Sequence, residues 1–220
     1  PAISDAITLI LGQANGFEVP FAAVPLMEHK DLPEQNLYSC LFGRDSLLIS
    51  DLLFNVKPHL RLNVIQALAL VQGTKFDEKS EEEPGRIAHE VRTMDDPVAQ
   101  KLSEHGDWKF PYYGSVDATL IWMMQIHRAA IDDPLILDIV IGGQVLWERF
   151  IAATNWVLAR LETPSGFIES KRVNPKGIAN QVWKDSGDSY MHAIGDLARG
   201  DSTASVETVG ETYDAIMAAA

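Results

Sequence analysis

The chain has 220 residues, enough for one domain with a substantial core, and its 46% hydrophobic and 22% charged residues are typical of a globular protein rather than a disordered one. A net charge of −13 argues against nucleic-acid binding, which needs a basic surface, but it identifies no partner because acidic surfaces commonly serve solubility. The single cysteine, Cys40, excludes an intrachain disulfide and a cysteine-rich metal site, and mildly favours a reducing compartment.

No segment predicts a membrane span or a secretory signal. Residues 1–11 carry Asp5 and have neither a basic leader nor a credible cleavage site. The apolar stretch at 135–143 is interrupted by Asp138 and is too short to cross a bilayer. We therefore expect a soluble, cytoplasmic protein. Because the chain begins at Pro1 and stops inside an alanine-rich helical pattern, we also expect a processed or excised piece.

Apolar residues at helical spacing predict helices along most of the chain. The first covers 46–54, with Asp45 or Ser46 as the expected cap, and the second covers 59–73 after Pro58. A charged stretch at 75–84 predicts a solvated loop. Further helices are expected at residues 117–130, 144–161, 190–198 and 206–219.

Residues 163–188 contain five glycines or prolines and predict an ordered functional loop. No segment shows sustained alternation of polar and apolar residues, so we predict an all-α chain. Helix pairs alternating with long loops favour a toroid, with inner helices around an axis and outer helices surrounding them. About three of the usual six pairs would be present.

Three aspartates recur at nearly equal intervals. Asp45, Asp117 and Asp185 are separated by 72 and 68 residues, roughly what two helices and their loops consume. Each should stand at the same stage of a repeated helix pair. The spacing therefore predicts that their carboxylates gather on one rim.

The segments around these aspartates resemble those of the bacterial amylo-α-1,6-glucosidase (glycogen-debranching) type of glycoside hydrolase, and more distantly glucoamylases and trehalases. The resemblance implies an (α/α)6 barrel, with residues 1–220 forming a single α-helical domain that is the N-terminal half of the catalytic domain. It also implies inverting acid/base hydrolysis of α-glucosidic bonds in glucans or oligosaccharides. The matching segments, in the family's order, are 42–47 (FGRDSL), 83–92 (EPGRIAHEVR), 112–119 (YYGSVDAT) and 180–189 (NQVWKDSGDS).

Glycosidic cleavage passes through an oxocarbenium-like centre, so it needs one protonated carboxyl and one carboxylate. Asp185 is the candidate general acid, because the Trp183 ring could stack on a sugar and lower the local polarity, which would retain the proton. By resemblance, the family's Trp-X-Asp aspartate matches Asp185. Asp188 is the alternative acid. Both could instead cap a helix beginning near Tyr190.

Arg44 and Asp45 suit the vicinal hydroxyls of one sugar ring, since the first is a fork of donors and the second an acceptor. The resemblance implies that they bind the sugar at the cleavage subsite; a helix cap with a surface ion pair is the alternative. Tyr112, Tyr113 and Asp117 would form another wall of the sugar site. Tyr113 could instead belong to the core, and Asp117 could cap a helix.

The remaining candidates are less specific. Glu90 or Arg92 could contact sugar, or the two could form a structural ion pair. No His-Glu-X-X-His zinc motif exists because residue 93 is threonine. Trp183 and Lys184 are expected to contact substrate, and Trp108 could belong to the site or to the core. No phosphate loop, nicotinamide fingerprint or metal cluster is apparent, so we expect no cofactor and no metal.

Two departures from the family pattern bear on activity. Residues 192–195 read HAIG where the family commonly has His-Ala-Asp-Gly, which removes one carboxylate. In the family the catalytic base is typically a glutamate from the C-terminal half, and Glu207 and Glu211 are poor substitutes because they lie within a predicted helix. Three hypotheses follow: half of an enzyme completed by a missing C-terminal half or another chain, a sugar-binding half-barrel without turnover, or a helical interaction protein that forms a homodimer.

Overall fold

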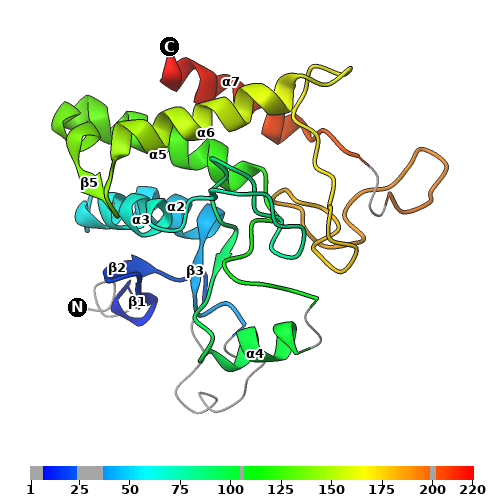
Figure 1. Ribbon diagram of the computed structural model, residues 1–220, viewed down its shortest axis with the longest axis horizontal. Coiled ribbons are helices and arrows are strands. Elements are labelled where there is room, and N and C mark those ends of the chain that lie inside the picture. The colour runs from blue at the N-terminus through cyan, green and yellow to red at the C-terminus, as the bar shows by residue number, and fades with distance from the viewer. Residues whose placement is uncertain (1–6, 24–36, 105–106, 199–201) are drawn as a thin grey trace.

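The computed structural model describes residues 7–23, 37–104, 107–198 and 202–220 (Figure 1). Helices account for 42% of these residues, and three two-stranded antiparallel sheets lie among them. The described chain is therefore mixed α and β, and our prediction of an all-α partial (α/α)6 toroid is wrong. The strands are only two to four residues long, which is too short to produce a detectable alternation of polar and apolar residues.

Helix α5 (Asp117–Asp132) is at the centre of the helical packing. It contacts α2 (Gly43–Leu52), α3 (His59–Ala69), α6 (Leu146–Leu161) and α7 (Val206–Ala219), as Figure 1 shows. Trp122 of α5 is fully buried, and its indole N–H donates to the carbonyl of Ile65 at 3.1 Å. Within the described ranges, no helix combines the length and the apolar surface that crossing a bilayer would need.

The strands form hairpins and one long-range pair. β1 (Leu11–Ala14) and β2 (Phe17–Pro20) are joined by Asn15-Gly16, both at positive φ, which is the turn chemistry of a tight hairpin. The pair β5 (Val140–Ile141) and β6 (Gln144–Val145) turns through Gly142-Gly143 in the same way and follows the 3-10 helix η3 (Pro134–Asp138).

The long-range pair joins β3 (Leu41–Phe42) to β4 (Glu90–Val91), with Phe42 opposite Glu90. Because β3 leads directly into α2, this pairing brings the first turn of α2 close to residues 89–90. The contact is tight: a Cβ on Gly43 would lie 2.2 Å from the carbonyl oxygen of Ala88. The pairing therefore positions the start of α2 at one wall of the candidate site.

The predicted helix at 206–219 has the same bounds as α7, and the segments 117–130 and 144–161 correspond closely to α5 and α6. The helix expected at 46–54 begins earlier, at Gly43, with Phe42 at the cap position and no side-chain cap, so neither Asp45 nor Ser46 has the expected role. The hydroxyl of Ser46 donates instead to the Pro20 carbonyl at 2.7 Å. α3 ends at Ala69, before the expected 73.

Two other local predictions fail. Residues 190–198 are not helical: Met191 and Leu197 form an isolated antiparallel bridge around a turn in which Gly195 has a φ of 93°. The short helix α4 (Pro97–Ser103) was not predicted, although Asp96 caps it by accepting from Val98 N at 2.7 Å and Pro97 occupies its first turn. The expected loop at 163–188 contains no helix, and Ser170 within it bridges to Thr203.

Candidate functional site

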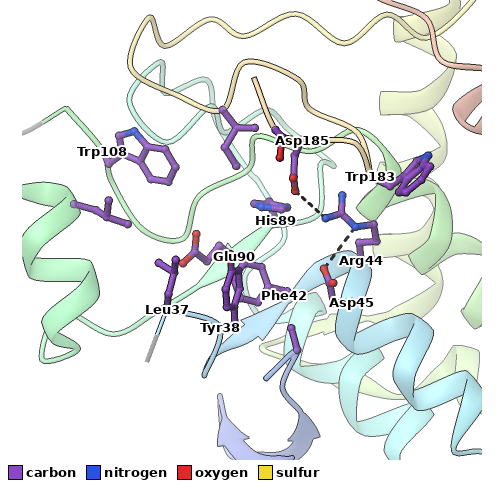
Figure 2. A pocket seen from close by; sticks show the side chains of 14 residues that line it. Leu37, Tyr38, Phe42, Arg44, Asp45, His89, Glu90, Trp108, Trp183 and Asp185 are labelled. Carbon is purple, nitrogen blue, oxygen red and sulfur yellow. Dashed lines mark hydrogen bonds and ion pairs between the residues drawn. The ribbon is translucent and has the colours of Figure 1, made fainter. Parts of the chain in front are cut away.

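A pocket of about 480 Å³ opens where the start of α2, strand β4 and the loop at 178–186 meet (Figure 2). Its walls combine charged, aromatic and aliphatic side chains, several of which come from loops. The lining residues are Ala22, Leu37, Tyr38, Phe42, Arg44, Asp45, His89, Glu90, Leu102, Trp108, Ile178, Trp183, Asp185 and Ser186.

Arg44 connects the three aspartates that the sequence singled out. Its Nη1 donates to Asp117 Oδ2 at 3.1 Å, its Nη2 donates to Asp185 Oδ2 at 3.1 Å, and its Nε lies 3.5 Å from Asp45 Oδ2. Burial alone would lower the pKa of Arg44, but the charges of Asp117 and Asp45 outweigh that effect and raise it. The carboxylates therefore do gather around one point, the guanidinium of Arg44.

Asp117 is buried and is the first residue of α5. The cap position belongs to Val116, which makes no side-chain cap, and the hydroxyl of Ser115 accepts from Ala118 N at 3.2 Å. Asp117 itself accepts hydrogen bonds from Ser115 and Arg44. Its carboxylate lies at the positive end of the helix dipole, which favours a negative charge there. Asp117 therefore anchors Arg44 from behind and does not cap α5.

Asp185 lines the pocket, with 40% of its side chain exposed, and is ion-paired with Arg44. The ion pair suits a hydrogen-bond acceptor more than a proton donor. Trp183 also lines the pocket, whereas Asp188 is exposed and outside the lining. Since residues 190–198 form no helix, Asp185 and Asp188 have no helix to cap.

Lys184 is not among the residues that line the pocket. Its Nζ lies 3.9 Å from Glu207 Oε1 and 4.9 Å from the centre of the Trp183 ring. The Trp183 indole also acts on Glu207, whose pKa is lowered first by its own backbone N–H and then by that indole. Lys184 and Glu207 therefore both interact with Trp183, and neither lines the pocket.

Tyr112 and Tyr113 are buried, and neither lines the pocket. Tyr113 donates to the Val71 carbonyl at 2.7 Å, as its core alternative would require. Tyr112 donates to Glu81 Oε1 at 3.2 Å and stacks on Trp108, with ring centroids 4.2 Å apart and planes at 22°. Burial raises the pKa of both phenols. The contribution of Tyr112 is thus indirect, as the support behind Trp108.

Glu90 lines the pocket but is committed to a buried ion pair. Arg92 Nε donates to Glu90 Oε1, while Arg92 Nη1 donates to Asp96 Oδ2 at 2.8 Å and Arg92 Nη2 donates to the Leu37 carbonyl. Burial raises the pKa of Glu90, and Arg92 opposes that rise. This geometry fits the structural alternative for Glu90, although its position leaves one side toward the pocket (Figure 2).

His89 is a lining residue that the sequence did not single out. It is 3% exposed, and burial, with the charges of Arg44 and Arg86, lowers its pKa to about 3. It is therefore a neutral imidazole. Within the described part of the chain, its buried Nδ1 has no hydrogen-bond partner. The imidazole ring makes edge-on contacts with two aromatic rings. Its centroid lies 5.6 Å from that of Phe42 and 6.2 Å from that of Tyr112.

Glu211, on α7, is in the electrostatic field of Asp117 and Arg44. Burial and the charge of Asp117 raise its pKa to about 8, so it holds a proton at neutral pH. Among the described residues, its buried Oε2 has no hydrogen-bond partner. Glu211 is therefore a neutral carboxyl close to the Arg44 cluster, although it does not line the pocket.

Buried polar contacts fix the loop that carries Asp185. Arg86 is almost fully buried and donates to Gln181 Oε1 at 2.9 Å, to the Glu81 carbonyl at 3.0 Å and to Glu83 Oε1 at 3.0 Å. Gln181 in turn donates to Glu81 Oε2, and its carbonyl accepts from Val116 N at 2.8 Å. This arrangement ties the loop to the start of α5, so the position of Asp185 relative to Asp117 does not depend on the loop alone.

The geometry gives one guanidinium surrounded by carboxylates at the end of a pocket with aromatic walls. Such an arrangement can bind hydroxyl groups from both sides, since arginine donates and aspartate accepts. In the described ranges, no three histidine, cysteine, aspartate or glutamate side chains are placed to hold a metal ion together. No family model matches the chain, and no curated protein matches it either.

Proposed function

We propose that the chain is a glycoside hydrolase-like protein that binds the glucosyl unit of an α-glucosidic bond in a glucan or oligosaccharide. The observation that carries this proposal is the cluster in which Arg44 contacts Asp45, Asp117 and Asp185 at one end of the pocket. The resemblance of four sequence segments to debranching-type glycoside hydrolases also supports it, and three of those segments contain the residues of this cluster.

The roles follow from which groups reach the pocket. Asp45 and Asp185 both line it and can accept hydrogen bonds from vicinal hydroxyls, while Arg44 donates to the same ring. Asp117 is 1% exposed and serves by orienting Arg44. Trp183 offers an exposed ring face at the edge of this end for the apolar C–H surface of a sugar.

Hydrolysis with inversion would need a proton donor and a base on opposite sides of the sugar. Asp185 is the proposed donor: a bound hydroxyl that accepts from Arg44 Nη2 would release the carboxylate from its ion pair, and the freed carboxylate would take up a proton from solvent and pass it to the leaving oxygen. We assign the base to no described residue.

A second candidate function is sugar binding without turnover. The observation that favours it is the ion pair itself, because a carboxylate held by Arg44 at 3.1 Å is arranged as an acceptor. This candidate uses the same pocket and the same contacts, and differs only in the absence of chemistry.

The test is a combined binding and turnover assay with maltose, isomaltose and trehalose. Calorimetry measures binding, and proton NMR identifies the anomer of released glucose, which is β for inversion of an α bond. Asp185→Asn should abolish turnover and Asp188→Asn, the matched control, should not. The reverse result overturns the assignment of Asp185. Binding without turnover supports the second candidate, and the absence of both refutes the proposal.

A further inference from the structure

The pocket differs chemically from one end to the other. Its polar end consists of Arg44, Asp45 and Asp185, and its apolar end consists of Leu37, Tyr38, Leu102 and Trp108. Figure 2 shows Arg44 and Asp185 on one side and Trp108 and Leu37 on the opposite side, with His89 and Glu90 between them. A ligand that fills the pocket would therefore meet charged groups at one end and carbon atoms at the other.

The apolar end has little to offer a hydroxyl group. Leu37 and Leu102 carry no polar side-chain atoms, and the indole N–H of Trp108 already donates to the Lys176 carbonyl at 2.8 Å. The nearby carboxylate of Glu90 is bound by Arg92, which leaves the Tyr38 hydroxyl as the polar side-chain group of this end. A second glucose placed here carries several hydroxyls and would meet one side-chain partner, so most of its hydroxyls would be buried unpaired, which costs more binding energy than its C–H surface gains.

The volume is sufficient for two groups. About 480 Å³ lies within the range of pockets that bury a complete small ligand, so a glucosyl ring at the polar end leaves space beyond it. Stacking on Tyr112 fixes the Trp108 ring in one orientation, and α4 positions Leu102. The apolar end is thus a formed surface with a defined ring plane.

We infer that, among α-glucosides, the pocket favours those whose leaving group is an aromatic or aliphatic alcohol over those whose leaving group is another glucose. The glucosyl ring lies against Arg44 and Asp185, and the hydrophobic aglycone lies against Trp108 and Leu102. This inference rests on the proposed function and specifies the substrate class of the same site.

The test compares the affinities of methyl α-glucoside, phenyl α-glucoside and maltose for the intact chain by calorimetry. Binding is measured rather than turnover, so an absent catalytic base does not affect the result. Burial of the phenyl ring should make phenyl α-glucoside bind at least about tenfold more tightly than maltose. Leu102→Asn should remove most of that preference, and a circular dichroism spectrum equal to that of the wild type shows that the variant is folded.

Trp147→Ala is the matched control, because Trp147 is an exposed tryptophan on α6 that does not line the pocket. It should preserve the preference. If maltose binds as tightly as phenyl α-glucoside and all binding depends on Arg44, this inference fails while the proposed function stands. A preference that survives Leu102→Asn also overturns it. If none of the three ligands binds, the proposed function itself fails.

Discussion

Replacing Glu211 with glutamine tests the electrostatics around the Arg44 cluster. Burial and the charge of Asp117 raise the pKa of Glu211 to about 8 against its ordinary 4.5, with a smaller rise from Glu207 and an opposing effect from Arg44. Between these two pH values the unfolded chain has released the proton and the folded chain still holds it. The folded state then binds more protons, so the free energy of unfolding falls as the pH rises from about 5 to 8.

The difference of 3.5 between the two values, at 1.36 kcal/mol per pH unit, sets an upper limit of about 5 kcal/mol. Glu211 is only half-buried, so solvent screening reduces the effect, and we expect about 1–3 kcal/mol. Glutamine has nearly the same shape and cannot ionise. Glu211→Gln should therefore match the wild type near pH 4.5 and become more stable than it, by that amount, above pH 8.

The assay is urea unfolding at pH 5, 6, 7 and 8. Asp214→Asn is the control, because Asp214 is an exposed residue on the same helix and the substitution likewise replaces an acid with its amide. The free energy of unfolding of Glu211→Gln, relative to the wild type, should rise steadily across the series. The difference in unfolding free energy between Asp214→Asn and the wild type should stay constant. Equal unfolding free energies for the wild type and Glu211→Gln at every pH would refute the reasoning.

Three further substitutions probe the scaffold by urea or thermal unfolding. Gly43→Ala should cost about 1–3 kcal/mol, because the new Cβ would lie 2.2 Å from the Ala88 carbonyl oxygen; unchanged stability would mean that β3 and β4 separate easily. Arg86→Met should cost about 3–5 kcal/mol by leaving its buried acceptors unpaired, and a neutral effect would contradict that account. Ser205→Ala removes the hydroxyl that accepts from Thr208 N, and thermal unfolding should show a loss of about 1 kcal/mol unless the end of α7 is already frayed.

The long helices were predictable because their signal is local. In α5, α6 and α7 the apolar residues repeat at helical spacing over 14 to 16 residues, and the sequence places them nearly correctly. The strands were not predictable in this way. β3 and β4 have two residues each, and all of α2 and α3 lies between them in the sequence. The β1–β2 hairpin is different: its Asn15-Gly16 turn is a recognisable signal that a search for alternation alone misses.

The site was predictable in its charged residues and not in its walls. Asp45, Asp117 and Asp185 could be selected from motifs, but their common contact with Arg44 joins residues up to 141 positions apart, which no local pattern encodes. Tyr112 has the same neighbours in sequence whether its ring faces a sugar or the core. Leu102 carries no chemical signal at all, because a leucine in a pocket wall and a leucine in a core are identical in sequence.

The charge balance around Arg44 links the scaffold to the proposed chemistry. Asp45, Asp117 and Asp185 all contact this one guanidinium, so a further ionised carboxylate nearby would be repelled with little compensation. Glu211 avoids this repulsion because it holds a proton. Asp45 and Asp185 are the two carboxylates of the Arg44 cluster that line the pocket. A hydroxyl-rich ring needs both acceptors and a donor at fixed positions, and these two carboxylates with Arg44 are the set that the proposed sugar site would use.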